Sequence, residues 1–218
     1  GRLCRDRGIV FHVDAAQAVG KIPFNVVDLN IDMASFSAHK AYGPKGVGAF
    51  YIRRGLKIKP QAVVHGGGHE KGMRSGTLPT HQIVGMGEAF ALSQRHLADE
   101  MERISRFKAR VLAALQKLGG IIVNGDQEHC CPGILNVSVE GVDGETLLMN
   151  LYNLAVSSGS ACNSASVEPS FVLSAMGVSR QLGLSAVRIS IGRFTTSEEI
   201  DYAIAELESV IARLRDAV

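Results

Sequence analysis

The chain has 218 residues, of which 46% are hydrophobic and 20% charged, and a formal net charge of +2. Such a composition is typical of a globular protein, and charges of both signs are interspersed, which argues against a binding surface for nucleic acid or anionic lipid. No apolar run approaches the roughly 18 residues of a membrane span, and the four cysteines are too irregularly spaced for a disulfide framework. We therefore expect a protein of an interior compartment, with reduced thiols and no membrane or nucleic-acid partner.

The first half of the sequence predicts pieces of a buried sheet followed by a long helix. Polar residues stand where the first two strands end: Asp14 closes the first, and His39-Lys40 follows the second. A Gly- and His-rich segment leads into the helix, which a Gly-Gly pair ends. The predicted strands span residues 9–14, 32–37 and 47–52, the irregular segment 63–80, and the helix 81–118.

The second half mixes strands and helices in an order that is typical of a small α+β domain. The last helix has Thr196 or Ser197 as its N-cap and acidic residues in its first turn. We expect one domain to end at residue 97 and the small domain to cover 98–218. The expected elements are strands at 120–123, 133–139, 155–158 and 187–191 and helices at 144–154, 169–176 and 197–214.

Lys40 is the first candidate for chemistry. A lysine at a strand end beside His39 and Ser37 could serve as a Schiff-base nucleophile, or be a solvated surface lysine. If Lys40 binds pyridoxal phosphate, Asp14 could keep the pyridine nitrogen protonated, and Gln17 could reach the ring oxygen. The alternative for Asp14 is that it caps a short helix over residues 15–19.

Cys162 lies within ten small or polar residues, 157–166, the most unusual stretch of the sequence. A thiol on such a loop is typical of a nucleophile that travels between a buried substrate and an external acceptor. Arg188 and Arg193 flank a strand and could clamp a carboxylate or form ion pairs. We interpret the adjacent Cys130 and Cys131 as structural.

The sequence predicts no resident metal ion. His65 and His69 are four residues apart, which aligns two ligands only on a helix, and the three glycines between them argue against one.

Together these segments resemble the cysteine desulfurases of the IscS/NifS type, class V members of the pyridoxal phosphate (PLP) fold-type I superfamily. The resemblance covers nearly the whole chain. The order and spacing of its motifs fit that family without evident gaps, including the spacing of 122 positions from Lys40 to Cys162 (162 − 40). The segments that carry it are 12–17, 37–40 with 42–46, 74–77, 157–166, and Arg188 with 192–196.

The resemblance implies an α/β fold, here the end of the large PLP-binding domain plus the small α+β domain, and pyridoxal 5'-phosphate as the cofactor. Lys40 would form the Schiff base and move protons at the substrate's α-carbon. Cys162 would take sulfur from L-cysteine as a persulfide, leaving L-alanine, and could transiently ligate a cluster. Asp14 would pair with the pyridinium nitrogen of the ring, and Gln17 with the ring oxygen. The phosphate would be held by Ser37, His39 and Thr77, and the substrate carboxylate by Arg188.

The resemblance also implies partners and a place in the cell. Thr77 would reach the cofactor of a neighbouring subunit, so we expect a homodimer. The loop around Cys162 would deliver sulfur to an iron-sulfur scaffold protein or to other sulfur acceptors, in the cytoplasm or, in a eukaryote, the mitochondrial matrix.

Some features depart from the family. Members are about twice as long and the chain opens with Gly1 rather than Met, so we expect a C-terminal portion whose activity alone is uncertain. Ala38 stands where Gly is usual, and Asn163 where Thr is usual.

Three alternatives stay open from the sequence. The first is a selenocysteine lyase of the same fold, which does not strictly need Cys162. The second is a non-catalytic fragment or paralogue that binds a partner. A thiol hydrolase using Cys162 ranks lowest, because nothing indicates which histidine would be its base.

Overall fold

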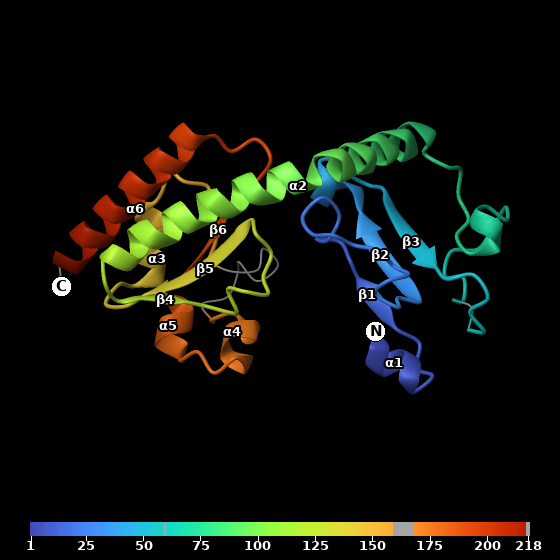
Figure 1. Cartoon of the computed structure of the whole chain (residues 1–218), viewed down its shortest axis with the longest axis horizontal. Helices are drawn as coiled ribbons and strands as arrows, with labels where there is room; N and C mark the ends of the chain where they lie inside the picture. Colours follow the sequence, from blue (N-terminus) through green and yellow to red (C-terminus); the bar gives the residue numbers. More distant parts are fainter. Residues whose placement is uncertain (59, 159–167, 217–218) are drawn as a thin grey trace. The chain divides into compact units, whose positions relative to one another are not determined.

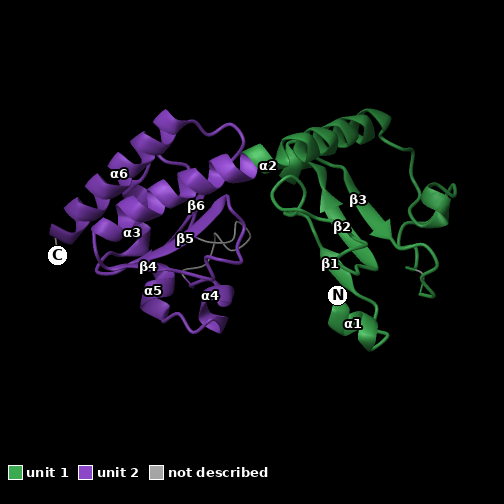
Figure 2. Cartoon of the chain, in the orientation of Figure 1, with its two compact units in different colours: residues 1–99 green, residues 100–218 purple. Residues whose placement is uncertain are grey.

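The computed structural model describes residues 1–58, 60–158 and 168–216 (Figure 1). The chain divides into two compact units, residues 1–99 and 100–218 (Figure 2). Helix α2 (Thr80–Lys117) contributes residues to both units, and its bounds confirm the predicted long helix. Within the described ranges, none of the helices combines the length and the apolar character that crossing a membrane requires.

Unit 1 contains a three-stranded sheet in the order β1-β2-β3. Strand β1 (His12–Asp14) is parallel to β2 (Met33–Ser37), and β3 (Gly48–Ile52) is antiparallel to β2. All three predicted strands are present, but β1 starts three residues later than expected. The short helix α1 (Arg2–Asp6), which the sequence did not predict, precedes it, and the Ile9 N–H bonds back to its Cys4 carbonyl at 2.9 Å.

Asp32 joins the parts of this sheet at the start of β2. Its Oδ2 accepts from the Phe11 N–H at 2.9 Å, and its Oδ1 accepts from the Arg53 guanidinium at 2.7 Å. The Phe11 N–H and then Arg53 hold the pKa of Asp32 below its ordinary value, against the opposing effect of burial. The apolar contacts beneath the sheet come from Ala15, Ala18, Ile31 and Ala34, with Phe11, Val13, Phe24, Val26, Phe36 and Tyr51 around them.

Unit 2 is built on an antiparallel sheet in the order β4-β5-β6. Side chains alternate along its strands, so that Leu135 and Val137 face the core while Asn136 lies on the opposite face. The elements after α2 are β4 (Ile121–Val123), β5 (Ile134–Val139), α3 (Gly144–Asn150), α4 (Phe171–Ala175), α5 (Arg180–Leu184), β6 (Ala186–Ser190) and α6 (Ser197–Asp216).

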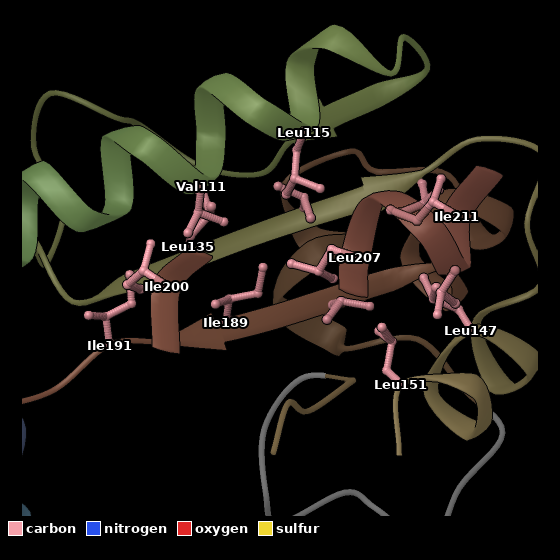
Figure 3. Packing of buried hydrophobic residues seen from close by; sticks show 14 residues of the cluster. Val111, Leu115, Leu135, Leu147, Leu151, Ile189, Ile191, Ile200, Leu207 and Ile211 are labelled. Carbon is pink, nitrogen blue, oxygen red and sulfur yellow. The ribbon is translucent and has the colours of Figure 1, made fainter. Parts of the chain in front are cut away.

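The core of unit 2 lies between this sheet and helices α2 and α6. Figure 3 shows Val111 and Leu115 directed from α2 toward the strands that carry Leu135 and Ile189. Val111 and Leu115 are almost fully buried, and each buried side chain of this size stabilises the fold by about 1.5 to 3 kcal/mol. The two helices thus cover one face of the sheet, and Asn136, Ser138 and Arg188 lie on the other.

Residues at the ends of two helices also meet in unit 2. Arg215, in the last turn of α6, donates hydrogen bonds to the carbonyls of Leu118, Gly119 and Gly120, which directly follow α2. At the other end of α6, Thr196 and Glu199 exchange hydrogen bonds of 2.9 and 3.2 Å. This reciprocal pair is a capping box, and it confirms the predicted N-terminus of the helix.

Three expectations for unit 2 were wrong. Helix α3 ends at Asn150 rather than Leu154, because residues 151–154 form turns instead. The predicted strand over 155–158 is a single bridge, formed by Ser157 with Arg188. Helix α5 was not predicted, although the Ser179 hydroxyl accepts from the Leu182 N–H at 3.3 Å, which is an N-cap signal.

Candidate functional site

Four of the predicted cofactor-binding residues of unit 1 gather at one edge of its sheet. Strands β1 and β2 are parallel and in register, with Asp14 opposite Ser35, so their carboxyl ends meet at the same edge. Asp14 ends β1, and Ser37 ends β2 and leads into the short 3-10 helix η1 (Ala38–Ala41) that carries His39 and Lys40. Gln17 follows in the turns after β1.

Asp14 does not cap a helix. Its Oδ1 accepts from the Ala16 N–H at 3.0 Å, which forms an Asx turn, and residues 16–21 are turns rather than a helix. The alternative of a capped helix over 15–19 was therefore wrong. The second carboxylate oxygen of Asp14 has no partner among the described residues and is available to a ligand cation. Gln17 accepts from the Lys21 ammonium through its Oε1.

The η1 turn presents its lysine and histidine to solvent while its alanines anchor it. Ala38 and Ala41 are buried, and His39 and Lys40 are exposed. Tyr42 adopts a left-handed conformation with φ 63°, which ends the turn, and the Gly43 N–H bonds back to the Ala38 carbonyl at 2.9 Å. Within the described ranges, the side chains of His39 and Lys40 form no hydrogen bond or ion pair, so both remain free for a ligand.

Gly48 explains why β3 can run close to this turn. It lies opposite Ser37, and a Cβ atom there would collide with the Phe36 carbonyl oxygen. The glycine therefore allows the two strands to approach at the point where β2 passes into η1.

Thr77 stands three residues before helix α2. It lines a cavity of about 750 Å³ in unit 1, together with Ser35, Gly48, Phe50 and Arg74. Neither Lys40 nor Asp14 lines this cavity.

Arg188 occupies the central position of β6. Two backbone hydrogen bonds fix the pattern of the ladder between β5 and β6: one joins Gly133 to Ile191, and the other joins Val139 to Ser185. Hydrogen-bonded and non-hydrogen-bonded pairs alternate along an antiparallel ladder, so Asn136 and Arg188 form a non-hydrogen-bonded pair. In such a pair the two side chains stand on one face and at their closest approach. The half-buried Arg188 guanidinium has no partner within the described residues, as expected for a clamp that awaits a carboxylate.

Arg193, the other arginine of that motif, does form an ion pair. Its Nε lies 2.6 Å from Oε1 of Glu100, and both side chains are largely buried. The two arginines of this motif thus differ: Arg193 forms an ion pair, whereas the Arg188 guanidinium has no partner in the part of the chain that the structure describes.

Two asparagines near Arg188 were missed in the sequence. Asn124 donates through Nδ2 to Oδ1 of Asn136 at 2.7 Å and to Oγ of Ser138 at 2.8 Å, which fixes the Asn136 amide on the face that carries Arg188. Asparagines in strands are uncommon, and the Asn-x-Ser spacing over 136–138 places both polar groups on one face. That spacing was the signal available.

Cys162 lies outside the described residues. The described chain on its N-terminal side is tied to β6, because Ser157 pairs with Arg188.

The donor set of unit 1 fits pyridoxal phosphate. Four side-chain groups lie at the edge where the two parallel strands end. They are the Asp14 carboxylate, one oxygen of which has no partner among the described residues, the Ser37 hydroxyl, the His39 imidazole and the Lys40 ammonium group. These are the groups needed for a pyridinium nitrogen, a phosphate and an aldehyde. Among the described residues, no three His, Cys, Asp or Glu side chains group as metal ligands would.

Comparisons with known proteins identify the family of this chain. The family model for aminotransferase class-V matches residues 1–203. "Cysteine desulfurase IscS" of Escherichia coli O139:H28 is 55% identical over 216 residues, covering 99% of this chain and 54% of the relative. The relative of the same name from Shigella boydii serotype 18 gives the same values. The chain therefore spans about half the length of the curated relatives it matches.

Solved structures agree. A structure titled "NIFS-like protein" superposes with a TM-score of 0.84 at 36% identity, over 96% of this chain and 54% of the other. A NifS-like protein from Rickettsia africae gives a TM-score of 0.86 at 27% identity, over 97% and 56% of the two chains. The fold is thus that of the PLP-dependent class V enzymes, and the chain belongs to the aminotransferase class-V family.

Proposed function

We propose that the whole protein to which this chain belongs is a PLP-dependent cysteine desulfurase. It takes sulfur from L-cysteine, releases L-alanine and carries the sulfur as a persulfide on Cys162. The observation that supports this most strongly is the edge of unit 1, where Asp14, Ser37, His39 and Lys40 have side-chain groups without a partner among the described residues. The 55% identity to an IscS relative supports it independently.

The cofactor, when bound, supplies an electron sink for the bond changes at the substrate's α- and β-carbons. Asp14 holds a positive charge on the ring nitrogen through its free carboxylate oxygen, while its other oxygen is fixed by the Ala16 N–H. Lys40 binds the cofactor and moves a proton at the substrate's α-carbon. Gln17 contacts the ring oxygen, and Ser37, His39 and the partner subunit's copy of Thr77 hold the phosphate.

The small domain, residues 98–218 in this proposal, supplies the substrate clamp and the sulfur acceptor. Arg188 binds the cysteine carboxylate in bidentate fashion, which is supported by a guanidinium that has no partner among the residues the structure describes. The Cys162 thiolate forms a bond to the substrate sulfur as the bond between that sulfur and its β-carbon breaks. The proton that completes the methyl group of alanine comes from an acid of the site, for which His39 is our candidate.

The persulfide then passes to an iron-sulfur scaffold protein or to another sulfur acceptor. We also propose a homodimer, in which Thr77 serves the cofactor of the neighbouring subunit; within unit 1, Thr77 lines a cavity that Lys40 does not line. We place the protein in the cytoplasm, or in the mitochondrial matrix of a eukaryote, without nucleic acid or membrane as partners.

Borohydride reduction tests the lysine directly. The whole protein is incubated with pyridoxal phosphate, reduced and mapped by peptide mass spectrometry. We expect the pyridoxyl group on Lys40, with loss of the adduct in Lys40→Ala and its retention in Lys45→Ala, a matched exposed lysine of the following turn. An adduct on another lysine, or none, contradicts the proposal.

A second measurement tests the sulfur chemistry. With L-cysteine, the protein should release alanine and gain one sulfur atom on the peptide that contains Cys162. Cys162→Ala should abolish both when cysteine is the substrate. If that variant retains turnover of selenocysteine alone, the protein is a selenocysteine lyase instead.

A further inference from the structure

Lys108 of α2 is buried, with 9% of its surface exposed. Its ammonium nitrogen donates to the sulfur of Cys130, 2.9 Å away in the loop between β4 and β5. The thiol is the only hydrogen-bond partner of this ammonium among the described residues. An ammonium group removed from water is costly unless an anion or several acceptors compensate for it. Among the described residues, the Cys130 thiol is the one group that compensates for the burial of the Lys108 ammonium.

The surroundings of Cys130 hold its sulfur in position. Cys130 is half-buried, and its Sγ also contacts the Gln127 carbonyl at 3.3 Å, as a donor. The loop is shaped by Asp126, whose carboxylate accepts from the N–H groups of Glu128 and His129. The Asp126 carboxylate thus forms its hydrogen bonds with the backbone and with the His129 ring, and not with Lys108.

We propose that Cys130 is a peroxide-reactive thiol activated by Lys108. The thiolate is the reactive form of cysteine, and an adjacent lysine cation stabilises its negative charge. This site is separate from the proposed desulfurase chemistry, since it needs neither the cofactor nor Cys162.

The reaction is a two-electron oxidation. The Cys130 sulfur attacks one oxygen of hydrogen peroxide, a sulfur–oxygen bond forms and the oxygen–oxygen bond breaks. The departing hydroxide takes up the proton that the Cys130 thiol, a donor to the Gln127 carbonyl, has released, and it leaves as water, so that sulfur is oxidised to a sulfenic acid while the peroxide is reduced. Lys108 can then donate its hydrogen bond to the new oxygen.

Cys131 provides a control within the same protein. It is the next residue and is also half-buried, but its thiol forms no hydrogen bond among the described residues. The whole protein is treated with hydrogen peroxide in the presence of a 1,3-diketone that traps sulfenic acids, and each cysteine is quantified by peptide mapping. We expect Cys130 to be labelled about tenfold faster than Cys131.

Two variants test the role of the cation. Lys108→Met keeps a long apolar stem and removes the charge, so the labelling rate of Cys130 should fall about tenfold, while Lys108→Arg should retain most of it. Thermal unfolding establishes that each variant is folded. Equal labelling of Cys130 and Cys131 in the unaltered protein overturns the proposal without any variant, as does an unchanged Cys130 rate in a folded Lys108→Met protein.

Discussion

Ser157 and Arg188 pair through their backbones, with the Arg188 N–H donating to the Ser157 carbonyl at 2.6 Å and the Ser157 N–H donating to the Arg188 carbonyl at 3.3 Å. The proposed substrate clamp is therefore bonded to a residue five positions before Cys162. Because Arg188 is in a non-hydrogen-bonded position relative to β5, its backbone groups are directed away from that strand and are available to Ser157.

This pairing predicts that the backbone N–H of Ser157 matters for sulfur transfer. Ser157→Pro removes the donor to Arg188, and persulfide formation on Cys162 should slow by about tenfold, because misplacement of a reacting group is costly. Cofactor binding, followed by its absorbance, should not change. Ser157→Ala retains the backbone N–H and serves as the control. A loss of similar size in both variants would argue against the backbone role.

Arg188 and its neighbour Asn136 should control the affinity for cysteine. Arg188→Gln removes a charged hydrogen bond to the carboxylate, and KM should rise by about tenfold to a hundredfold. Asn136→Ala should raise KM by a smaller factor with kcat little changed, because the amide next to the clamp is lost. Asn153→Ala is the matched control, since its amide donates to Glu206 instead. A fall in kcat alone, at constant KM, would contradict this assignment for Asn136.

The ion pair between Glu100 and Arg193 should be important for the stability of unit 2. The two side chains are only 11% and 16% exposed, so Glu100→Gln leaves a buried guanidinium without its counter-charge and should cost about 3 kcal/mol. The exposed pair of Glu88 and Arg95 is a control, and Glu88→Gln should cost less than about 1 kcal/mol. Urea unfolding measures both. Equal effects would show that burial does not set the strength of the pair.

Acid should weaken unit 1 through Asp32. Its pKa in the folded protein is below the ordinary value of 3.8, so its ionised form contributes stability above that value. The contribution is lost as the pH falls from the ordinary value through the lowered pKa. Urea midpoints of the original protein and Asp32→Asn should therefore differ at neutral pH and converge below pH 3.8. Asp28→Asn, at an exposed position, should show no such convergence.

The sequence predicted the elements whose signals are local. The long apolar repeat of α2, the three strands of unit 1 and the capping residue Thr196 were all visible in short windows of sequence. Helix α1 was missed because five residues carry too little periodicity. Residues 155–158 were wrongly assigned to a strand because so short a segment does not reveal whether a partner strand is present along its length.

The candidate site was predictable only in part. Lys40 and Asp14 were found because polar residues followed apolar strands, and the parallel pairing of β1 with β2 supplied the reason that they share an edge. The ion pair of Arg193 depends on Glu100, 93 residues away, and the contact between Lys108 and Cys130 spans 22 residues. No local pattern encodes such contacts.

The position of Arg215 has a consequence for the electrostatics of unit 2. Helix dipoles place partial negative charge at their C-terminal ends, and this single guanidinium stands in the last turn of α6 while it contacts the carbonyls that follow α2. Arg213 in α6 and Lys117 in α2 also stand in the last turns of their helices, but Arg215 is the cation that serves both C-terminal ends at once. Proteolytic trimming of the chain before Arg215 would therefore remove favourable charge from two helix ends, and it should loosen the end of α2 as well as the helix that was cut.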